Sequence, residues 1–169
     1  MNTERETANS KFQITTHSPE ETRQLGEKVG NRIQAGTTVT LFGDLGSGKT
    51  VFVQGLAKGL GVPEDYYITS PSYTLINEYP ARHTFFHIDL YRIESTVDFE
   101  DIGLYEILDQ NGVVAIEWAD RLNQNLLADH VNIQIEISGD ESRIICITAS
   151  GLGPVNLLKK LQKSTNVHP

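Results

Sequence analysis

The sequence is poor in cysteine and in basic residues, and it contains no long hydrophobic run. Its 169 residues include 1 cysteine, Cys146, which excludes an internal disulfide and a metal site built from cysteines. Lys and Arg total 14 against 22 Asp and Glu, and the net charge of -8 argues against an extended nucleic-acid surface. No apolar run approaches the length of a membrane span, and residues 1–11 lack the apolar segment of a signal peptide. We therefore expect a cytoplasmic protein with no membrane association.

The length and the hydrophobic content indicate one globular domain. With 38% hydrophobic residues, a chain of 169 residues is long enough to bury a substantial core. We expect residues 1–10 to form a disordered tail and residues 11–169 to form a single domain. Because Cys146 lies in the apolar run at 143–147, its thiol is expected to pack in the core.

The clearest motif is a glycine-rich stretch between a strand pattern and a helix pattern. Residues 43–50 read GDLGSGKT, after the β-branched run at 38–42 and before a helical pattern at 51–60. In a phosphate-binding loop, glycines let backbone N–H groups surround phosphate oxygens at a helix N-terminus. Lys49 would then reach the β- and γ-phosphates, and the Thr50 hydroxyl would bind Mg²⁺. The residues expected to contact the nucleotide are Asp44, Leu45, Gly46, Ser47, Gly48, Lys49, Thr50 and Val51.

The rest of the chain alternates strand and helix patterns, which indicates an α/β fold with a mostly parallel central sheet. Strands are predicted at residues 12–15, 74–79, 83–89, 112–118, 131–137 and 143–149. The last two should form an antiparallel hairpin that ends the sheet. Ser18, Pro19 and Glu21 form a capping box for a helix that should run to about Gln34. Short helices are expected within residues 90–108 and 119–129, and an amphipathic helix at 154–163.

Two acidic residues stand at the ends of apolar strands, where a phosphate loop needs a carboxylate for Mg²⁺. Asp89 follows the run at 85–88, and Glu117 follows the run at 113–116. Because the strand of Glu117 is the more continuously apolar, we expect it to neighbour the loop strand and assign Glu117 to the metal. Asp89 is then the second carboxylate, which binds Mg²⁺ through water or orients the attacking water. The reverse assignment stays open, as does simple capping of a strand end by either acid.

Two features near these acids have two interpretations each. Trp118 should alternate to the strand face opposite Glu117, either as a core aromatic or as a lid or partner anchor near the nucleotide. The hydroxyl-rich residues 66–75 form either a switch loop that senses the γ-phosphate or a plain connection.

The nearby arginines and histidines are weaker candidates. Arg92 and Arg121 could stabilise phosphate charge, but surface ion pairs with the many acids are favoured. His83 and His87 should share one strand face, and a zinc site is not expected because no third ligand lies at a suitable spacing.

Four segments occur in order along the chain: GDLGSGKT at 43–50, TSPSYTL at 69–75, HIDLYR at 87–92 and IEW at 116–118. Together they resemble the TsaE family, the small phosphate-loop ATPase of bacterial tRNA threonylcarbamoyladenosine synthesis. The resemblance covers almost all of residues 12–150. The family more often has Thr where this chain has Ser72, so the hydroxyl is retained.

The resemblance implies a three-layer fold of the P-loop NTPase type and an enzyme that hydrolyses ATP with Mg²⁺. It implies that Thr50 and Glu117 contact the metal, that Asp89 is needed for hydrolysis, and that Trp118 lies beside the site; Lys49 completes the catalytic set. It also implies weak activity alone and docking onto the paired TsaB and TsaD proteins, which modify adenosine 37 of tRNA. Adenine is expected between the N-terminal segment and the C-terminal hairpin, so Arg143 is a candidate contact.

Three other functions fit a phosphate loop less well. A small-molecule kinase usually has an Arg-rich lid, whereas residues 119–129 offer Arg121 alone. A GTPase usually has an Asn-Lys-x-Asp segment that reads guanine, which this sequence lacks. A nucleotide sensor without catalysis would not need Asp89 for its cellular role. Because the chain is acidic, we expect tRNA to contact it only indirectly, through the partners.

Overall fold

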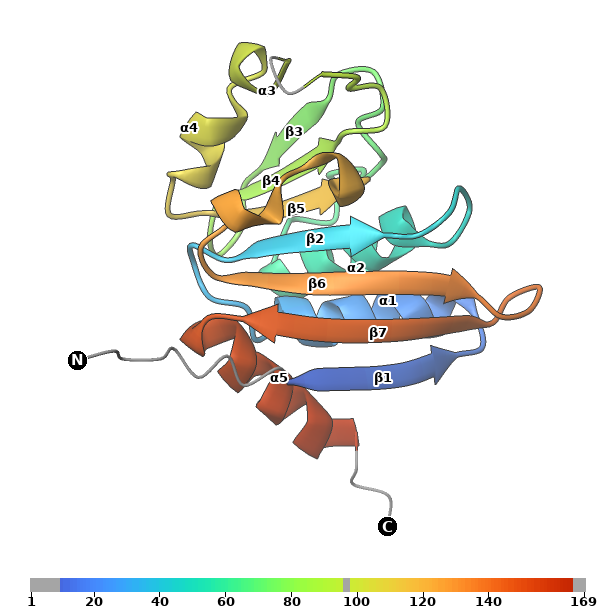
Figure 1. Ribbon diagram of the computed structural model, residues 1–169. Helices are drawn as coiled ribbons and strands as arrows, with labels where there is room; N and C mark the ends of the chain where they lie inside the picture. Colours follow the sequence, from blue (N-terminus) through green and yellow to red (C-terminus); the bar gives the residue numbers. More distant parts are fainter. Residues whose placement is uncertain (1–9, 96–97, 166–169) are drawn as a thin grey trace.

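The computed structural model describes residues 10–95 and 98–165, in which seven strands form one mixed sheet (Figure 1). The strands are β1 (Lys11–Thr16), β2 (Thr38–Phe42), β3 (Ile76–Tyr79), β4 (Phe85–Asp89), β5 (Val113–Glu117), β6 (His130–Ile137) and β7 (Arg143–Ser150). The α-helices are α1 (Pro19–Gly30), α2 (Lys49–Leu60), α3 (Asp98–Asp101), α4 (Leu104–Leu108) and α5 (Leu152–Thr165). Two 3-10 helices, η1 (Ala119–Arg121) and η2 (Gln124–Leu126), follow β5. The tail predicted for residues 1–10 lies, except for Ser10, outside the described residues.

The middle of the sheet is parallel, and both of its edges are antiparallel. Across the sheet the order is β1-β7-β6-β2-β5-β4-β3, with parallel pairing from β6 through β2 and β5 to β4. β3 is antiparallel to β4 at one edge, and β7 is antiparallel to both β6 and β1 at the other. The predicted α/β class and the C-terminal hairpin are confirmed. The expectation that this hairpin ends the sheet was wrong, because β1 adds an outer strand whose Phe12 and Ile14 pack on the core.

Helices cover the two faces of the sheet unequally. α1, α2 and α5 pack on one face over the larger hydrophobic cluster, whereas α3, α4 and η1 cover β4 and β5 on the other. The second face of β6 and β7 stays open, and Cys146 lies on it, half-buried, opposite the exposed Gln134. The predicted core position of the thiol was therefore wrong. Ile145 and Ile147 take the core positions because side chains alternate along a strand.

Glycines allow α1 and α2 to pack in close contact. Gly26 and Gly30 of α1 face α2, and Gly55 and Gly59 of α2 face α1. A Cβ atom on Gly55 would lie 1.9 Å from the carbonyl oxygen of Arg23, so a side chain there would force the helices apart. This contact fixes the helix that begins with Lys49 against the rest of the fold. Within the described ranges, no helix combines the length and the apolar character needed to cross a membrane.

Several element boundaries differ from prediction, among them those of α1, β3 and β4. α1 ends at Gly30 rather than near residue 34, and the Arg82 guanidinium donates hydrogen bonds to the carbonyls of Gly30 and Ile33 at this end. β3 begins after Leu75, which leaves the extended region with a φ of 68°. β4 begins at Phe85, so His83 lies in the preceding turn and does not share a strand with His87.

The carboxyl ends of the parallel strands β2, β4 and β5 lie together at one end of the sheet. β5 lies directly beside β2, as predicted from its continuous apolar run, and β4 follows it. β2 leads into the glycine-rich loop, β5 ends at Glu117, and β4 ends at Asp89. The topology therefore places the loop and both acids at the carboxyl ends of the strands, where open α/β sheets bind ligands.

Candidate functional site

The glycine-rich loop turns the chain from β2 into α2 through backbone conformations that favour glycine. Gly48, at the N-cap of α2, has a φ of 106°. Gly43 has a φ of 148°, and a Cβ atom there would lie 2.5 Å from the Ile135 carbonyl oxygen. The loop leads into the amino end of a twelve-residue helix, where free N–H groups and the helix dipole attract anions. The strand, loop and helix thus have the arrangement of a phosphate-binding loop.

The Lys49 ammonium group lies against the loop and an aromatic ring. Its Nζ donates hydrogen bonds to the carbonyl oxygens of Gly43 at 2.7 Å and Asp44 at 3.0 Å, and lies 4.0 Å from the centroid of the Trp118 ring. Burial lowers the pKa of Lys49, whereas the negative charge of Glu117 acts in the opposite direction. A buried cation held by carbonyl dipoles and a ring face is well placed to receive an anion.

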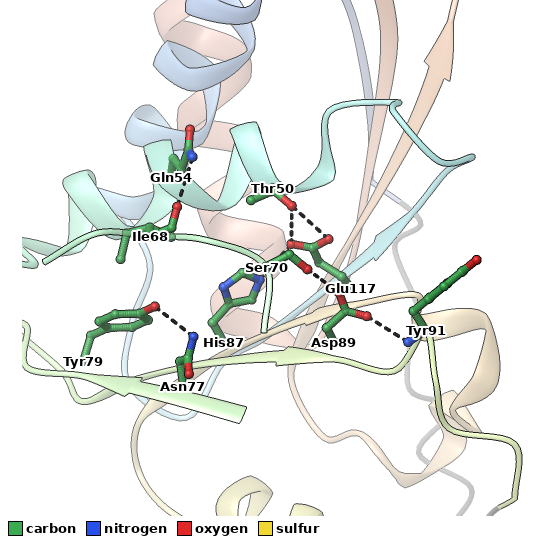
Figure 2. Close-up of polar contacts among 10 residues, drawn as sticks. All are labelled: Thr50, Gln54, Ile68, Ser70, Asn77, Tyr79, His87, Asp89, Tyr91 and Glu117. Carbon is green, nitrogen blue, oxygen red and sulfur yellow. Dashed lines mark hydrogen bonds and ion pairs between the residues drawn. The ribbon is translucent and has the colours of Figure 1, made fainter. Parts of the chain in front are cut away.

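The Thr50 hydroxyl and the Glu117 carboxylate meet beside the loop. Thr50 Oγ1 donates to Glu117 at 2.9 Å from Oε1 and 3.2 Å from Oε2 (Figure 2). Hydroxyl and carboxylate oxygens are the ligands that Mg²⁺ prefers, so these two residues fit the predicted ion. In the described parts of the chain, no group of three or more His, Cys, Asp or Glu residues could hold a metal ion. A bound Mg²⁺ would therefore take its other ligands from phosphate and water.

The Asp89 carboxylate is buried and oriented by two donors. The Ser70 hydroxyl donates to Oδ2, and the backbone N–H of Tyr91 donates to Oδ1 at 2.8 Å (Figure 2). Gln54 of α2 holds the same loop as Ser70 by donating to the Ile68 carbonyl at 3.0 Å. The hydroxyl-rich segment 66–75 is therefore attached to both the end of β4 and the loop helix.

A cavity of about 470 Å³ joins these groups. The predicted site residues that line it are Leu45, Gly46, Gly48, Lys49, Thr50, Val51, Asp89, Glu117 and Trp118. The remaining lining comes from Ser70, Ser72, Tyr73, Tyr91 and Arg92, whereas Asp44, Ser47 and Arg143 are not part of it. A second cavity of about 290 Å³ on the open sheet face has no charged residue in its lining and includes none of the predicted site residues.

Arg143 contacts the loop from the side of the β6–β7 hairpin. Its Nε donates to the Ser47 carbonyl at 2.8 Å, and its Nη2 donates to the Gly46 carbonyl at 3.2 Å. The same guanidinium donates through Nη1 to the Ser142 carbonyl at 2.8 Å. In this structure Arg143 therefore ties the hairpin to the loop backbone rather than lining the cavity.

Trp118 leaves β5 with a φ of 57° and combines its two predicted positions: it packs on the cluster at the face opposite Glu117, and its ring lies beside Lys49. The two nearby arginines differ from prediction. Arg92 lies 4.3 Å from the centroid of the Tyr73 ring, and Arg121 donates to a backbone carbonyl of residue 93. Among the described residues neither arginine forms an ion pair, so the expected surface pairs were wrong.

Sequence reasoning did not identify Ser70 and His87 as members of the site. His87 Nε2 lies 2.8 Å from Glu117 Oε1, and Ser70 contacts Asp89. A local signal existed for His87, because a residue two positions before Asp89 in a strand points to the same face. Ser70 had no such signal beyond the number of hydroxyl groups in its segment.

Comparison with known proteins identifies one family that matches this chain. The family described as "Threonylcarbamoyl adenosine biosynthesis protein TsaE" matches residues 16–145, well over half of the chain. The chain belongs to the TsaE family. The predicted resemblance is therefore confirmed.

Individual TsaE relatives match most of the chain. The protein named tRNA threonylcarbamoyladenosine biosynthesis protein TsaE of Bacillus subtilis is 36% identical over 153 residues, which cover 90% of this chain and 94% of that protein. The protein of the same name from Treponema pallidum is 41% identical over 136 residues, or 80% and 99% of the two chains. The crystal structure of Bacillus subtilis YdiB matches with a TM-score of 0.78 and 32% identity, covering 94% of this chain and 98% of that chain.

Proposed function

We propose that this TsaE family member is a cytoplasmic, Mg²⁺-dependent ATPase that supports tRNA threonylcarbamoyladenosine biosynthesis. The observation that best supports the proposal is the hydrogen bond between Thr50 and Glu117 beside Lys49, in the cavity at the loop. This set offers a cation for the phosphates and oxygen ligands for their metal ion. The relatives from B. subtilis and T. pallidum are named for the same tRNA modification.

The chain's own groups would bind the triphosphate and neutralise its charge. Backbone N–H groups of the loop would surround the phosphates, and Lys49 would exchange the carbonyls of Gly43 and Asp44 for phosphate oxygens. Thr50 and Glu117 would hold Mg²⁺, which when bound supplies further positive charge at the phosphates. Phosphoryl transfer depends mainly on positioning and charge neutralisation, and these residues provide both.

The two carboxylates would have different tasks. We assign Glu117 to the metal because it contacts Thr50, the hydroxyl that phosphate loops use for Mg²⁺. We assign Asp89 to the attacking water because Ser70 and the N–H of Tyr91 already hold its carboxylate in place at the cavity wall. Trp118 would remain beside the phosphates through its contact with Lys49.

Docking on the paired TsaB and TsaD proteins is part of the proposal. The net charge of -8 leaves little basic surface for tRNA, so the partners would hold the tRNA while ATP hydrolysis drives their turnover. Exposed apolar side chains line the cavity, including Leu45 at 77% and Tyr73 at 82% exposure. Such side chains suit contact with another protein.

The nucleotide is proposed to be ATP, with adenine between the N-terminal segment and the β6–β7 hairpin near Arg143. The guanine-reading Asn-Lys-x-Asp segment is absent from the sequence, which favours ATP over GTP. A small-molecule kinase on the same loop is less well supported. Its Arg-rich lid would have to come from residues 119–129, where Arg121 donates to the Ile93 carbonyl.

Phosphate release, measured for the chain alone and with purified TsaB and TsaD, tests the proposal. We expect slow basal release, stimulation by the partners, and loss of release in Lys49→Ala and Glu117→Ala. Lys58→Ala is the matched control, because Lys58 lies on the same helix and its exposed side chain pairs with Glu27. Phosphoryl transfer to a metabolite without phosphate release would support the kinase. Absence of ATP binding would overturn the proposal.

A further inference from the structure

His87 is a buried side chain next to the metal-binding pair that the proposed function leaves without a role. It is 0% exposed in β4, and its Nε2 lies 2.8 Å from Glu117 Oε1. Its Nδ1 is also buried and has no hydrogen-bond partner among the described residues. An unpaired buried nitrogen is unfavourable and uncommon in native proteins, so the placement of this imidazole needs an explanation.

The strand register explains why His87 lies next to Glu117 on the same face of the sheet. Within β4, His87 and Asp89 point to the same face, and across the β4–β5 pair His87 is opposite Ala115 while Asp89 is opposite Glu117. The small Ala115 side chain leaves room for the ring beside β5. On its other side the ring stacks on Phe85, with centroids 6.5 Å apart and planes at 14°. The imidazole therefore contacts both the Phe85 ring and the Glu117 carboxylate. Figure 2 shows His87 beside Glu117.

The hydrogen-bond partners determine which nitrogen of His87 bears the proton. An ionised Glu117 can only accept hydrogen bonds, and it already accepts from Thr50. His87 must therefore donate to Glu117 through Nε2–H. No described residue forms a hydrogen bond with Nδ1, so the contact with Glu117 is the one that orients the ring.

We propose that His87 is a positioning residue whose Nε2–H holds the Glu117 carboxylate toward Thr50, so that both oxygen ligands are oriented before metal and nucleotide bind. This inference rests on the proposed function. Of the two donors to Glu117, the imidazole is the one locked by packing on Phe85, whereas the Thr50 hydroxyl can rotate. Removing a hydrogen-bond donor to a metal ligand commonly lowers metal affinity about 10- to 100-fold.

Two variants separate the hydrogen bond from the space that the ring fills. His87→Phe keeps a flat ring of similar size without a donor, and His87→Gln keeps an N–H donor near the position of Nε2. The matched control is His83→Gln, in the turn before β4. Mn²⁺ binding in the presence of a non-hydrolysable ATP analogue is measured by electron paramagnetic resonance, and analogue binding without metal is measured in EDTA.

We expect His87→Phe to weaken Mn²⁺ binding roughly 10-fold or more while metal-free analogue binding stays unchanged, with most of the loss recovered in His87→Gln. Equal Mn²⁺ affinity in His87→Phe and wild type, or equal losses in both variants, would overturn the inference alone. Failure of the wild type to bind metal and nucleotide would overturn the proposed function and this inference with it. Nitrogen-15 NMR of the wild-type imidazole needs no variant to fold: protonated Nε2 supports the inference, and protonated Nδ1 with bare Nε2 overturns it.

Discussion

Asp89 and Glu117 are direct partners in the parallel register between β4 and β5, so the two acids lie side by side at the carboxyl ends of these strands, next to the glycine-rich loop. Each is almost fully buried, yet each meets a different part of the chain. Glu117 receives a hydrogen bond from Thr50 of the loop helix, and Asp89 receives one from Ser70 of the hydroxyl-rich segment. Substitutions at the two acids should therefore have different effects.

Glu117→Gln should weaken the metal-dependent part of nucleotide binding, because a neutral amide is a poorer ligand for Mg²⁺ than a carboxylate. Asp89→Asn should keep metal-dependent affinity near the wild-type value and slow hydrolysis about 100-fold, because this substitution changes the carboxylate that we propose orients the attacking water. ATP titrations with and without Mg²⁺, together with single-turnover phosphate release, measure both effects. Glu136→Gln, exposed on β6, is the control. Equal losses of metal-dependent binding at both acids would contradict the assignment.

Thr50→Val should reduce Mg²⁺-dependent ATP affinity roughly 10-fold, because the methyl group that replaces the hydroxyl cannot bind the ion or donate to Glu117. Thr50→Ser, which keeps the hydroxyl, should retain most of the affinity. Because Thr50 and Glu117 are in contact, the effects of Thr50→Val and Glu117→Gln should not add in the double variant. Strictly additive losses would show that the two side chains act independently.

Gly55→Ala should lower the free energy of unfolding by about 1–3 kcal/mol, because the added methyl group would overlap the Arg23 carbonyl in the α1–α2 contact. Urea denaturation measures the loss. Gly153→Ala in α5 is the control, because its nearest neighbour is the flexible end of the Gln34 side chain at 3.3 Å. A Gly55→Ala protein as stable as the wild type would contradict the close packing of the two helices.

Trp118 emission should report on Lys49, because Trp118 is the only tryptophan in the sequence and Lys49 Nζ lies 4.0 Å from the centroid of its ring. Lys49→Met should change the emission of the free protein and abolish the response to ATP, whereas the exposed control Lys58→Met should change neither. Steady-state fluorescence with an ATP titration makes the measurement. An unchanged spectrum for Lys49→Met would mean that the ammonium group does not rest on the ring in solution.

Local patterns were sufficient where a single segment determines its own conformation. The strand at 38–42 was placed correctly, the helical pattern at 51–60 lies within α2, and the strand predicted at 112–118 is observed at 113–117. A β-branched run defines the first strand and a continuous apolar run the second, and glycines with positive φ define both ends of the helix. The predicted stop near Gln34 was wrong. At the observed end of α1, Arg82 donates to the carbonyls of Gly30 and Ile33 from 52 and 49 positions away in the chain, a contact that no local pattern contains.

The candidate site shows the same division between local and distant effects. Loop residues and both acids were recognisable from motif and position, and the structure places both acids and all the predicted loop residues except Asp44 and Ser47 around one cavity. Strand alternation alone did not predict the contact of Trp118 with Lys49, because Trp118 adopts a left-handed conformation at the end of β5. The contact of His87 with Glu117 joins residues 30 positions apart on two strands whose pairing no local pattern specifies.

From the sequence by itself, one could determine that a glycine-rich loop joins a buried strand to a helix, that two other strands end in acids, and that the chain resembles the TsaE family. The loop and the strand ends are local properties of backbone conformation and apolar periodicity, and the resemblance depends on four short segments that occur in order along the chain. Only the tertiary structure decided that β1 forms an outer strand of the sheet, that the Trp118 ring lies beside Lys49, and that His87 contacts Glu117. Such contacts arise from the order and register of the strands, which long-range packing sets and no short stretch of sequence contains.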